Sequence, residues 1–134
     1  MIDSTSFIFY GHPNVLSQHK NTIEFTREEH LTKKGDCILG VNADFNLSEI
    51  KEITSNFSEI EIIIRCGDME EKIRAKVNKN FNHDGEIVIR KSDFLSERTL
   101  GINADRVAID IDRKMVDKLK DSEAKGKVII KGIE

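Results

Sequence analysis

The sequence predicts a strand-rich α+β domain, built from a unit of strand, strand, strand, helix and strand that is used twice. Two observations predict this. The segment 40–44 reads Gly-Val-Asn-Ala-Asp, and the segment 101–105 repeats it with a single Val-to-Ile exchange. Short segments with β-branched or aromatic residues at alternate positions also recur in the same order in both halves. Repetition of this kind favours two related halves.

The repeat extends upstream when a three-residue gap is allowed, with a spacing of 64 residues in place of 61. The matched pairs then include Asn14 with Asn78, His19 with His83, and Phe9 with Ile73. The alternative is chance similarity between two strand-turn-strand patterns. We expect one domain over residues 1–134, with repeats at about 7–67 and 71–134. One repeat is too small to bury its own sheet, so the two should share a barrel-like sheet around a pseudo-twofold axis.

Each half should supply four strands and one helix. The expected strands are 7–10, 22–26, 37–41 and 60–65, then 72–77, 86–90, 100–103 and 127–131. The first helix should begin after Asn46 or Ser48, because Leu47, Ile50, Ile53 and Phe57 follow at helical spacing. The second should begin after Asp112, with Ile111, Met115 and Leu119 as its apolar stripe.

Composition excludes several classes of protein. With 38% apolar and 34% charged residues, the chain is neither collagen-like nor disordered. No apolar run is long enough to cross a membrane. Two cysteines do not make a disulfide framework, so we expect reduced thiols and a cytoplasmic location. The net charge of −3 disfavours nucleic acid and anionic membranes as partners.

Residues present in both halves are first explained by the shared fold. His19 and His83 precede matched strands, where each is expected either to hydrogen-bond a backbone carbonyl or to act as a symmetry-related ligand. Asn-Ala-Asp follows the third strand of each half, and its carboxylates could bond backbone amides or face each other as a pair. Matched basic loops could hold an anion. The candidate ligand-binding residues are therefore Asn14, Asn42, Asp44, Asn78, His83, Asn103, Asp105, Lys34 and Arg98.

Residues found in only one half are freer to carry chemistry. The candidates for catalysis are His12, Asp36 and Cys37 together with His19, which both halves share, and those for metal binding are His12, His19 and Cys37. Together they would offer nitrogen, oxygen and sulfur ligands of the type that zinc prefers. Cys37 could also act as a nucleophile with a histidine as its base. The alternative is a buried, inert thiol, and no closed zinc motif is present.

Two sets of motifs resemble known proteins. Gly11–Val15, His19, Thr22–Thr26 and Leu31–Val41, with Ile89–Phe94, Arg98–Leu100 and Ala104–Asp105, resemble an archaeal family of short uncharacterised proteins, a domain of unknown function. That resemblance implies an archaeal cytoplasmic protein and no particular activity. The Gly35-Asp36 turn is similar to the turn of duplicated cradle-loop and double-psi barrels, although the second half departs from it. Fold alone does not choose a function among such barrels.

The sequence therefore favours a module that binds a small anionic ligand or a protein partner, in a monomer or a homodimer. The alternative is a small hydrolase or transferase, metal-dependent or not, with its site in the first repeat. Nucleic-acid binding ranks third. The sequence identifies no cofactor and leaves open whether the protein is an enzyme.

Overall fold

The computed structural model describes all residues, 1–134, as one strand-rich domain. The strands of the first half are β1 (Ser4–Tyr10), β2 (Thr22–Thr26), β3 (Ile38–Gly40) and β4 (Glu59–Cys66). Those of the second half are β5 (Met69–Val77), β6 (Glu86–Arg90), β7 (Thr99–Ile102) and β8 (Lys125–Ile133). Helix α1 (Leu47–Asn56) precedes β4, and the 3-10 helix η1 (Ala108–Asp110) and helix α2 (Arg113–Lys118) precede β8. Both halves have the predicted order of elements.

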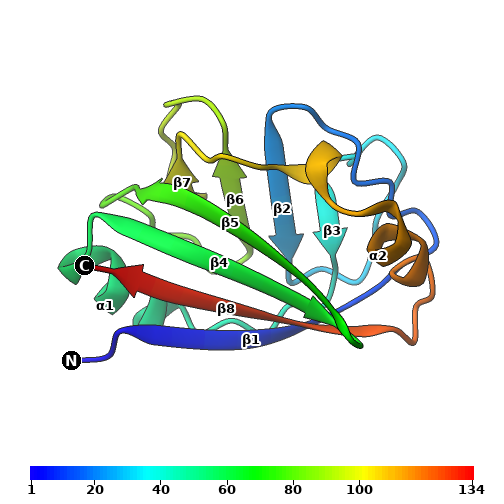
Figure 1. Cartoon of the computed structure of the whole chain (residues 1–134), viewed down its shortest axis with the longest axis horizontal. Coiled ribbons are helices and arrows are strands. Elements are labelled where there is room, and N and C mark those ends of the chain that lie inside the picture. Colours follow the sequence, from blue (N-terminus) through cyan, green and yellow to red (C-terminus); the bar gives the residue numbers. More distant parts are fainter.

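The α-helices begin where the sequence predicts and lie at opposite ends of the molecule (Figure 1). The side chain of Asn46 accepts a hydrogen bond from the Glu49 amide at 3.0 Å, which satisfies one of the free amides of the first turn of α1. Asp112 does the same for the Lys114 amide at 2.8 Å in α2. Neither helix has the length and apolar character needed to cross a bilayer.

All eight strands belong to one mixed sheet, in the order β1-β8-β4-β5-β7-β6-β2-β3. The β2–β3 and β6–β7 pairs are parallel and the other pairs are antiparallel. The prediction of a barrel needs correction, because the sheet keeps two edge strands, β1 and β3, and is not closed. A single bridge between Tyr10 and Val41 joins these edges. Strand β3 has only three residues, which leaves little backbone for a longer ladder.

The two halves meet through two antiparallel pairs at the centre of the fold. In the β2–β6 pair, Glu24 lies opposite Val88. In the β4–β8 pair, Ile63 lies opposite Ile129. The outer strands also pair across the halves, since β1 pairs with β8 and β5 with β4. Neither half therefore forms the sheet without the other.

Several backbone hydrogen bonds occur at equivalent places in both halves. The Arg27 amide donates to the Gly85 carbonyl, and the Lys91 amide, 64 residues after Arg27, donates to the Asn21 carbonyl. The Glu24 amide donates to the Cys37 carbonyl, as Val88 does to Arg98. The parallel pairs also shift register at matching points, between Glu24 and Phe25 and between Val88 and Ile89.

The first strand, however, follows a different spacing from the predicted one. Ile8 exchanges two hydrogen bonds with Asp44. In the second half the same two bonds join Arg74 to Asp105, although a spacing of 64 would place the match of Ile8 two residues earlier. The spacing there is 66, so Phe9 corresponds to Ala75, not to Ile73. The connection from Ile8 to Ile23 spans 15 positions and the one from Arg74 to Ile87 spans 13, so the first half has two extra residues, which account for the difference.

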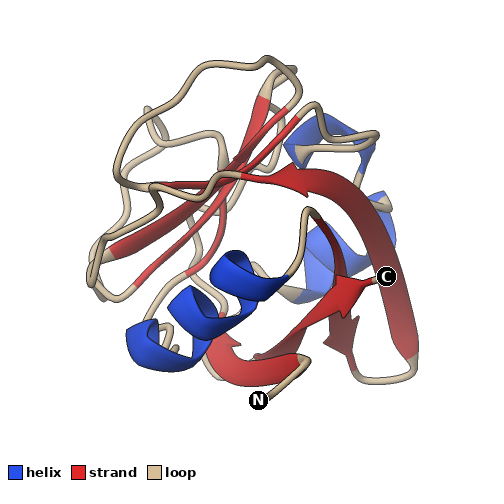
Figure 2. Ribbon diagram, turned by 90° about the vertical axis from the view of Figure 1, so that its left-hand side faces the viewer, coloured by secondary structure: helices blue, strands red, loops and turns tan.

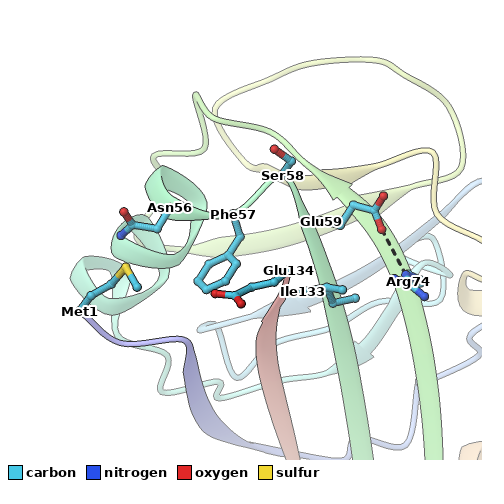
Figure 3. Close-up of a pocket in the computed structure, with 8 residues that line it drawn as sticks. All are labelled: Met1, Asn56, Phe57, Ser58, Glu59, Arg74, Ile133 and Glu134. Atoms are coloured by element: carbon cyan, nitrogen blue, oxygen red, sulfur yellow. Dashed lines mark hydrogen bonds and ion pairs between the residues drawn. The ribbon is translucent and has the colours of Figure 1, made fainter.

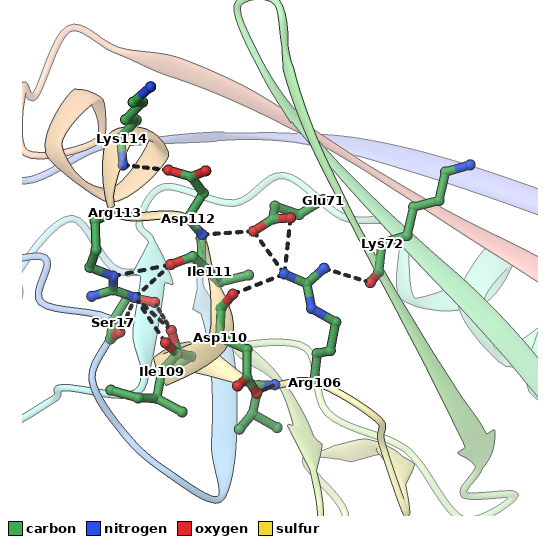
Figure 4. Close-up of polar contacts among 12 residues, drawn as sticks. Ser17, Glu71, Lys72, Arg106, Ile109, Asp110, Ile111, Asp112, Arg113 and Lys114 are labelled. Carbon is green, nitrogen blue, oxygen red and sulfur yellow. Dashed lines mark hydrogen bonds and ion pairs between the residues drawn. The ribbon is translucent and has the colours of Figure 1, made fainter.

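The longer connection contains Ser17, a buried residue with a left-handed φ of 48°. Arg113 at the start of α2 donates to the Leu16 carbonyl at 3.1 Å and the Ser17 carbonyl at 2.8 Å. The same guanidinium reaches carbonyls of η1 and of Ile111 (Figure 4). One side chain thus fastens the extra residues of the first half to the helical segment of the second.

The core fills the space between the two layers of strands that Figure 2 shows in profile. Phe7 packs edge-on against Phe25 and Phe45, with ring centroids 5.6 and 5.7 Å apart. Phe9 lies 5.1 Å from Phe25. Such aromatic pairs add to the free energy gained from area burial, and they connect β1 to β2.

Replacing Gly40 with alanine should lower the free energy of unfolding by about 1–3 kcal/mol. A methyl group at Gly40 would overlap the ring of Phe9, which is fully buried. Urea denaturation would measure the loss. Combining G40A with Phe9→Leu should cost less than the sum of the two single substitutions, because the smaller side chain makes room. Strictly additive losses would contradict this contact.

Candidate functional site

The two matched histidines shape the backbone of the turns before β2 and β6. Nδ1 of His19 accepts hydrogen bonds from the amides two and three residues later, both at 3.1 Å. Nδ1 of His83 accepts the equivalent two bonds at 3.0 and 2.9 Å. The prediction of a bond to a backbone carbonyl is therefore wrong in direction, since the ring nitrogen accepts. Because each ring nitrogen accepts hydrogen bonds from two backbone amides, it holds the backbone of its turn in place.

His12 and the matched asparagines also hold backbone. Nδ1 of His12 accepts from the Asn14 amide at 3.0 Å, and Oδ1 of Asn78 accepts from the Asn80 amide at 3.0 Å. His12 thus corresponds to Asn78, and Asn14 to Asn80, which corrects the predicted match of Asn14 with Asn78. The Asn14 side chain donates to the Leu31 carbonyl at 2.8 Å. Each of these side chains therefore forms hydrogen bonds with backbone groups of the loops and stabilises them.

The Asn-Ala-Asp segments likewise have local roles. Asn42 and Asn103 adopt left-handed backbone with φ of 52° and 51°, a conformation that asparagine tolerates. Oδ1 of Asp44 accepts the Ile8 amide at 2.7 Å, and Oδ1 of Asp105 accepts the amide of the matched residue in β5 at 2.9 Å. These carboxylates bond amides within strands β1 and β5.

The residues proposed for metal binding or catalysis are not gathered into one site. No group of three or more histidine, cysteine or acidic side chains could hold a metal ion. The carbonyl of Asp36 accepts from the amide of His19, but the hydrogen-bond partners of the Cys37 thiol do not include a histidine. Lys34 is exposed.

The buried acid of this molecule was not among the residues singled out. Glu24 in β2 is 6% exposed, and no other acidic or basic side chain is buried. Strand alternation places Ile23 and Phe25 in the core, and Glu24 on the opposite face with Val88. A buried carboxyl group is costly unless it is neutral or paired, so its surroundings decide its chemistry.

Four side chains from three neighbouring segments complete a polar group around Glu24. Oε1 of Glu24 lies 3.6 Å from Nη1 of Arg98 and 3.9 Å from Sγ of Cys37. Nη1 of Arg98 also contacts Oε2 of Glu86 at 2.7 Å. Nε of Arg90 donates to Oγ1 of Thr99 at 2.8 Å. We refer to Glu24, Cys37, Glu86, Arg90 and Arg98 as the Glu24 cluster.

Burial and neighbouring charges shift the protonation of this cluster. Burial, and then the charge of Glu86, raise the pKa of Glu24 to about 7, although Arg98 opposes the shift. Burial, and then the carboxylate of Glu24, raise the pKa of Cys37 to about 11. The carboxyl group therefore exchanges its proton near neutral pH, whereas the thiol stays protonated there. A protonated thiol is a hydrogen-bond donor and a poor nucleophile.

Arg90 is the cation of the cluster without an acidic partner. No carboxylate oxygen lies within 4.0 Å of its guanidinium nitrogens. Burial, and then the like charge of Arg98, lower the pKa of Arg90. Its guanidinium packs over the ring of Phe94 at 5.0 Å, a favourable cation–π contact. Two neighbouring guanidinium groups with one of them unpaired are suited to bind an added anion.

A surface pocket lies elsewhere, beside the chain termini. Figure 3 shows Met1 and Glu134 at this pocket, with residues 56–59, Arg74 and Ile133. Its one ion pair joins Arg74 to Glu59 at 3.2 Å. Its lining contains no histidine or cysteine.

The comparisons with known proteins agree with this picture of an uncharacterised domain. Residues 7–133 match a family model described as "Domain of unknown function (DUF371)". The chain belongs to this family. It is also 40% identical over 119 residues to the "Uncharacterized protein MJ0206" of Methanocaldococcus jannaschii, with 84% of this chain and 88% of that protein covered. The resemblance to an archaeal family of unknown function is confirmed at that level, and family membership assigns no activity.

Replacing Glu24 with glutamine should change how stability depends on pH. The unfolded carboxyl group loses its proton from about its ordinary pKa of 4.5, whereas the folded one keeps it to about 7. Between these values the unfolded chain binds fewer protons, so this group's contribution to stability falls as pH rises. The wild-type protein should therefore lose roughly 3 kcal/mol relative to E24Q between pH 4 and pH 8.

Urea denaturation across that pH range would measure this difference. Glu28→Gln, at an exposed position of the following loop, is the control and should show no such trend. A difference between wild type and E24Q that stays constant with pH would contradict a buried, titrating Glu24.

Cys37 should react slowly with iodoacetamide. At pH 8, a thiol with a pKa of about 11 should be alkylated roughly a hundredfold more slowly than a free cysteine. E24Q should accelerate the reaction, because it removes the negative charge that raises the pKa of this thiol. Peptide mass spectrometry separates Cys37 from Cys66. A rate equal to that of free cysteine would show that the pKa of this thiol is not raised, and a faster rate would show that the thiol is activated.

Proposed function

We propose that this protein is a recognition module that binds an anionic ligand, a carboxylate or a phosphate, at the Glu24 cluster. The observation that carries the proposal is the Arg90 guanidinium, which lies beside Arg98 without a carboxylate of its own. Guanidinium groups bind carboxylate and phosphate oxygens in bidentate geometry. An anion placed between the two arginines would relieve their mutual repulsion.

The charge of Glu24 controls this site. When Glu24 is ionised, it and Glu86 balance the two arginines. When Glu24 is protonated, only Glu86 balances them, and the cluster carries one net positive charge. Because the pKa of Glu24 is raised to about 7, we expect an anion to bind more tightly below neutral pH.

Apolar side chains next to Arg90 indicate the rest of the ligand. Phe94 and Leu95, in the loop between β6 and β7, are 59% and 53% exposed. Exposed aromatic and aliphatic side chains beside arginine are typical of recognition surfaces. We therefore infer a ligand, or a segment of a protein partner, that joins an anionic group to an apolar one.

These features support binding rather than nucleophilic catalysis. The Cys37 thiol donates toward Glu24 and is protonated at neutral pH. The Nδ1 atoms of His12 and His19 accept hydrogen bonds from backbone amides, so they are not free to act as bases.

We further infer that the two halves arose by duplication of one unit, with a pseudo-twofold axis between Glu24 and Val88 and between Ile63 and Ile129. The matching element order and the repeated hydrogen bonds support this. Two unpaired cysteines support a cytoplasmic location.

Phenyl phosphate and inorganic phosphate would test the binding proposal. Chemical shifts of the amides of Val88 and Arg90 should change on titration, and phenyl phosphate should bind several-fold more tightly because its ring can contact Phe94. Arg90→Gln should remove binding of both compounds. Phe94→Ala should remove only the advantage of phenyl phosphate, and Lys114→Gln, an exposed control on α2, should change neither. Equal binding by wild type and R90Q would overturn the proposal.

A further inference from the structure

The outer face of the β1-β8-β4-β5 layer is rich in basic side chains. Strand alternation puts the odd residues of β4 and β8 and the even residues of β5 on this face, which Figure 1 shows toward the viewer. Strand β5 contributes Lys72, Arg74 and Lys76. Strand β8 contributes Lys125, Lys127 and Lys131, and β4 contributes Arg65. We call these seven residues the basic face.

The charge of this face is opposite to that of the molecule. Only three acidic side chains, Glu59, Glu61 and Glu70, point the same way, so the face carries a net charge of +4. The whole chain has a net charge of −3, which leaves −7 for the remainder. Net charge alone disfavours nucleic acid as a partner, but the charge here is segregated by the fold.

Much of the positive charge is free. Glu70 pairs with Arg65 at 2.7 Å and with Lys72 at 3.7 Å, and Glu59 pairs with Arg74 at 3.2 Å. The remaining four lysines of the basic face form no ion pair. Alternate residues of a strand are about 7 Å apart and adjacent strands about 4.8 Å apart, so the sheet presents a regular array of cations.

We propose that the basic face binds the phosphate backbone of double-stranded nucleic acid without sequence preference. An array of lysines on a fixed sheet complements the repeated charge of a duplex. Its only aromatic residue is Tyr10 at the edge, so it lacks the stacking platforms that single strands need. At its centre Ile63 is buried and Ile129 is only partly exposed, so the face lacks the fully exposed apolar side chains that insertion into a membrane needs.

This surface is separate from the proposed ligand site. The Glu24 cluster lies on β2, on β6 and in the segments that precede β3 and β7, whereas the basic face lies on the other layer of strands. The two proposals therefore depend on different residues, and either can fail alone.

Fluorescence anisotropy with a labelled 20-base-pair duplex would test the proposal between 50 and 200 mM KCl. If the four free lysines each neutralise one phosphate, affinity should fall about a hundredfold over this range, a log–log slope of about −3.6. Lys127→Gln with Lys131→Gln should halve that slope to about −1.8. The control, Lys20→Gln with Lys114→Gln, removes the same charge from exposed positions off the basic face and should keep the wild-type slope.

Three outcomes would overturn the proposal. The first is the absence of duplex binding by the wild-type protein at 50 mM KCl. The second is an equal loss of slope in both double variants, which would mean that only total charge matters. The third is salt-sensitive self-association, abolished by K127Q with K131Q, in the absence of duplex binding. In that case the basic face would bind the acidic surface of a second copy of the chain. Urea denaturation of each variant confirms that it is folded.

Discussion

The antiparallel pairing of β2 with β6 is the constraint on which the rest of this structure depends. It joins the two halves at their centre and sets Glu24 opposite Val88. Each of these strands then carries a parallel partner from its own half, β3 or β7. Because the side-chain period of a strand is two, a slip of one residue would turn Ile23 and Phe25 out of the core and Glu24 into it. The core and the Glu24 cluster therefore share one register.

That register explains why a buried carboxyl group is tolerated. Glu24 lies beside Val88 of the partner strand on one face of the sheet. The flanking segments bring Cys37 and Arg98 close to its carboxylate oxygens. Burial favours the neutral acid and Arg98 favours the anion, and the balance leaves a pKa near neutrality. The polar groups are satisfied, since no buried side-chain nitrogen or oxygen lacks a partner.

Much of the local structure could be predicted from the sequence, because local patterns determine it. Helix caps such as Asn46 and the alternating strands depend on neighbours a few residues away. The spacing of 66 in the first strand could not be predicted, because the two extra residues near Ser17 are held by Arg113, 96 residues away. Glu24 was missed although a signal existed. It matches Val88 at the 64-residue spacing, so a charged residue in one half stands where the other half has an apolar residue. The partnership of Arg90 and Arg98 depends on strand pairing, which no short motif encodes.

The two layers of the fold respond to different properties of the solution. Lysine and arginine side chains ordinarily stay charged well above neutral pH, so interactions of the basic face are governed by salt through counterion release. At the Glu24 cluster, short ion pairs in a half-buried setting are screened less by salt, and the proton on Glu24 sets the net charge. An anion bound there would respond to pH more than to ionic strength, and a duplex on the opposite layer would respond to ionic strength more than to pH. The two proposed anion-binding surfaces would therefore be under separate physical control, the Glu24 cluster by pH and the basic face by ionic strength.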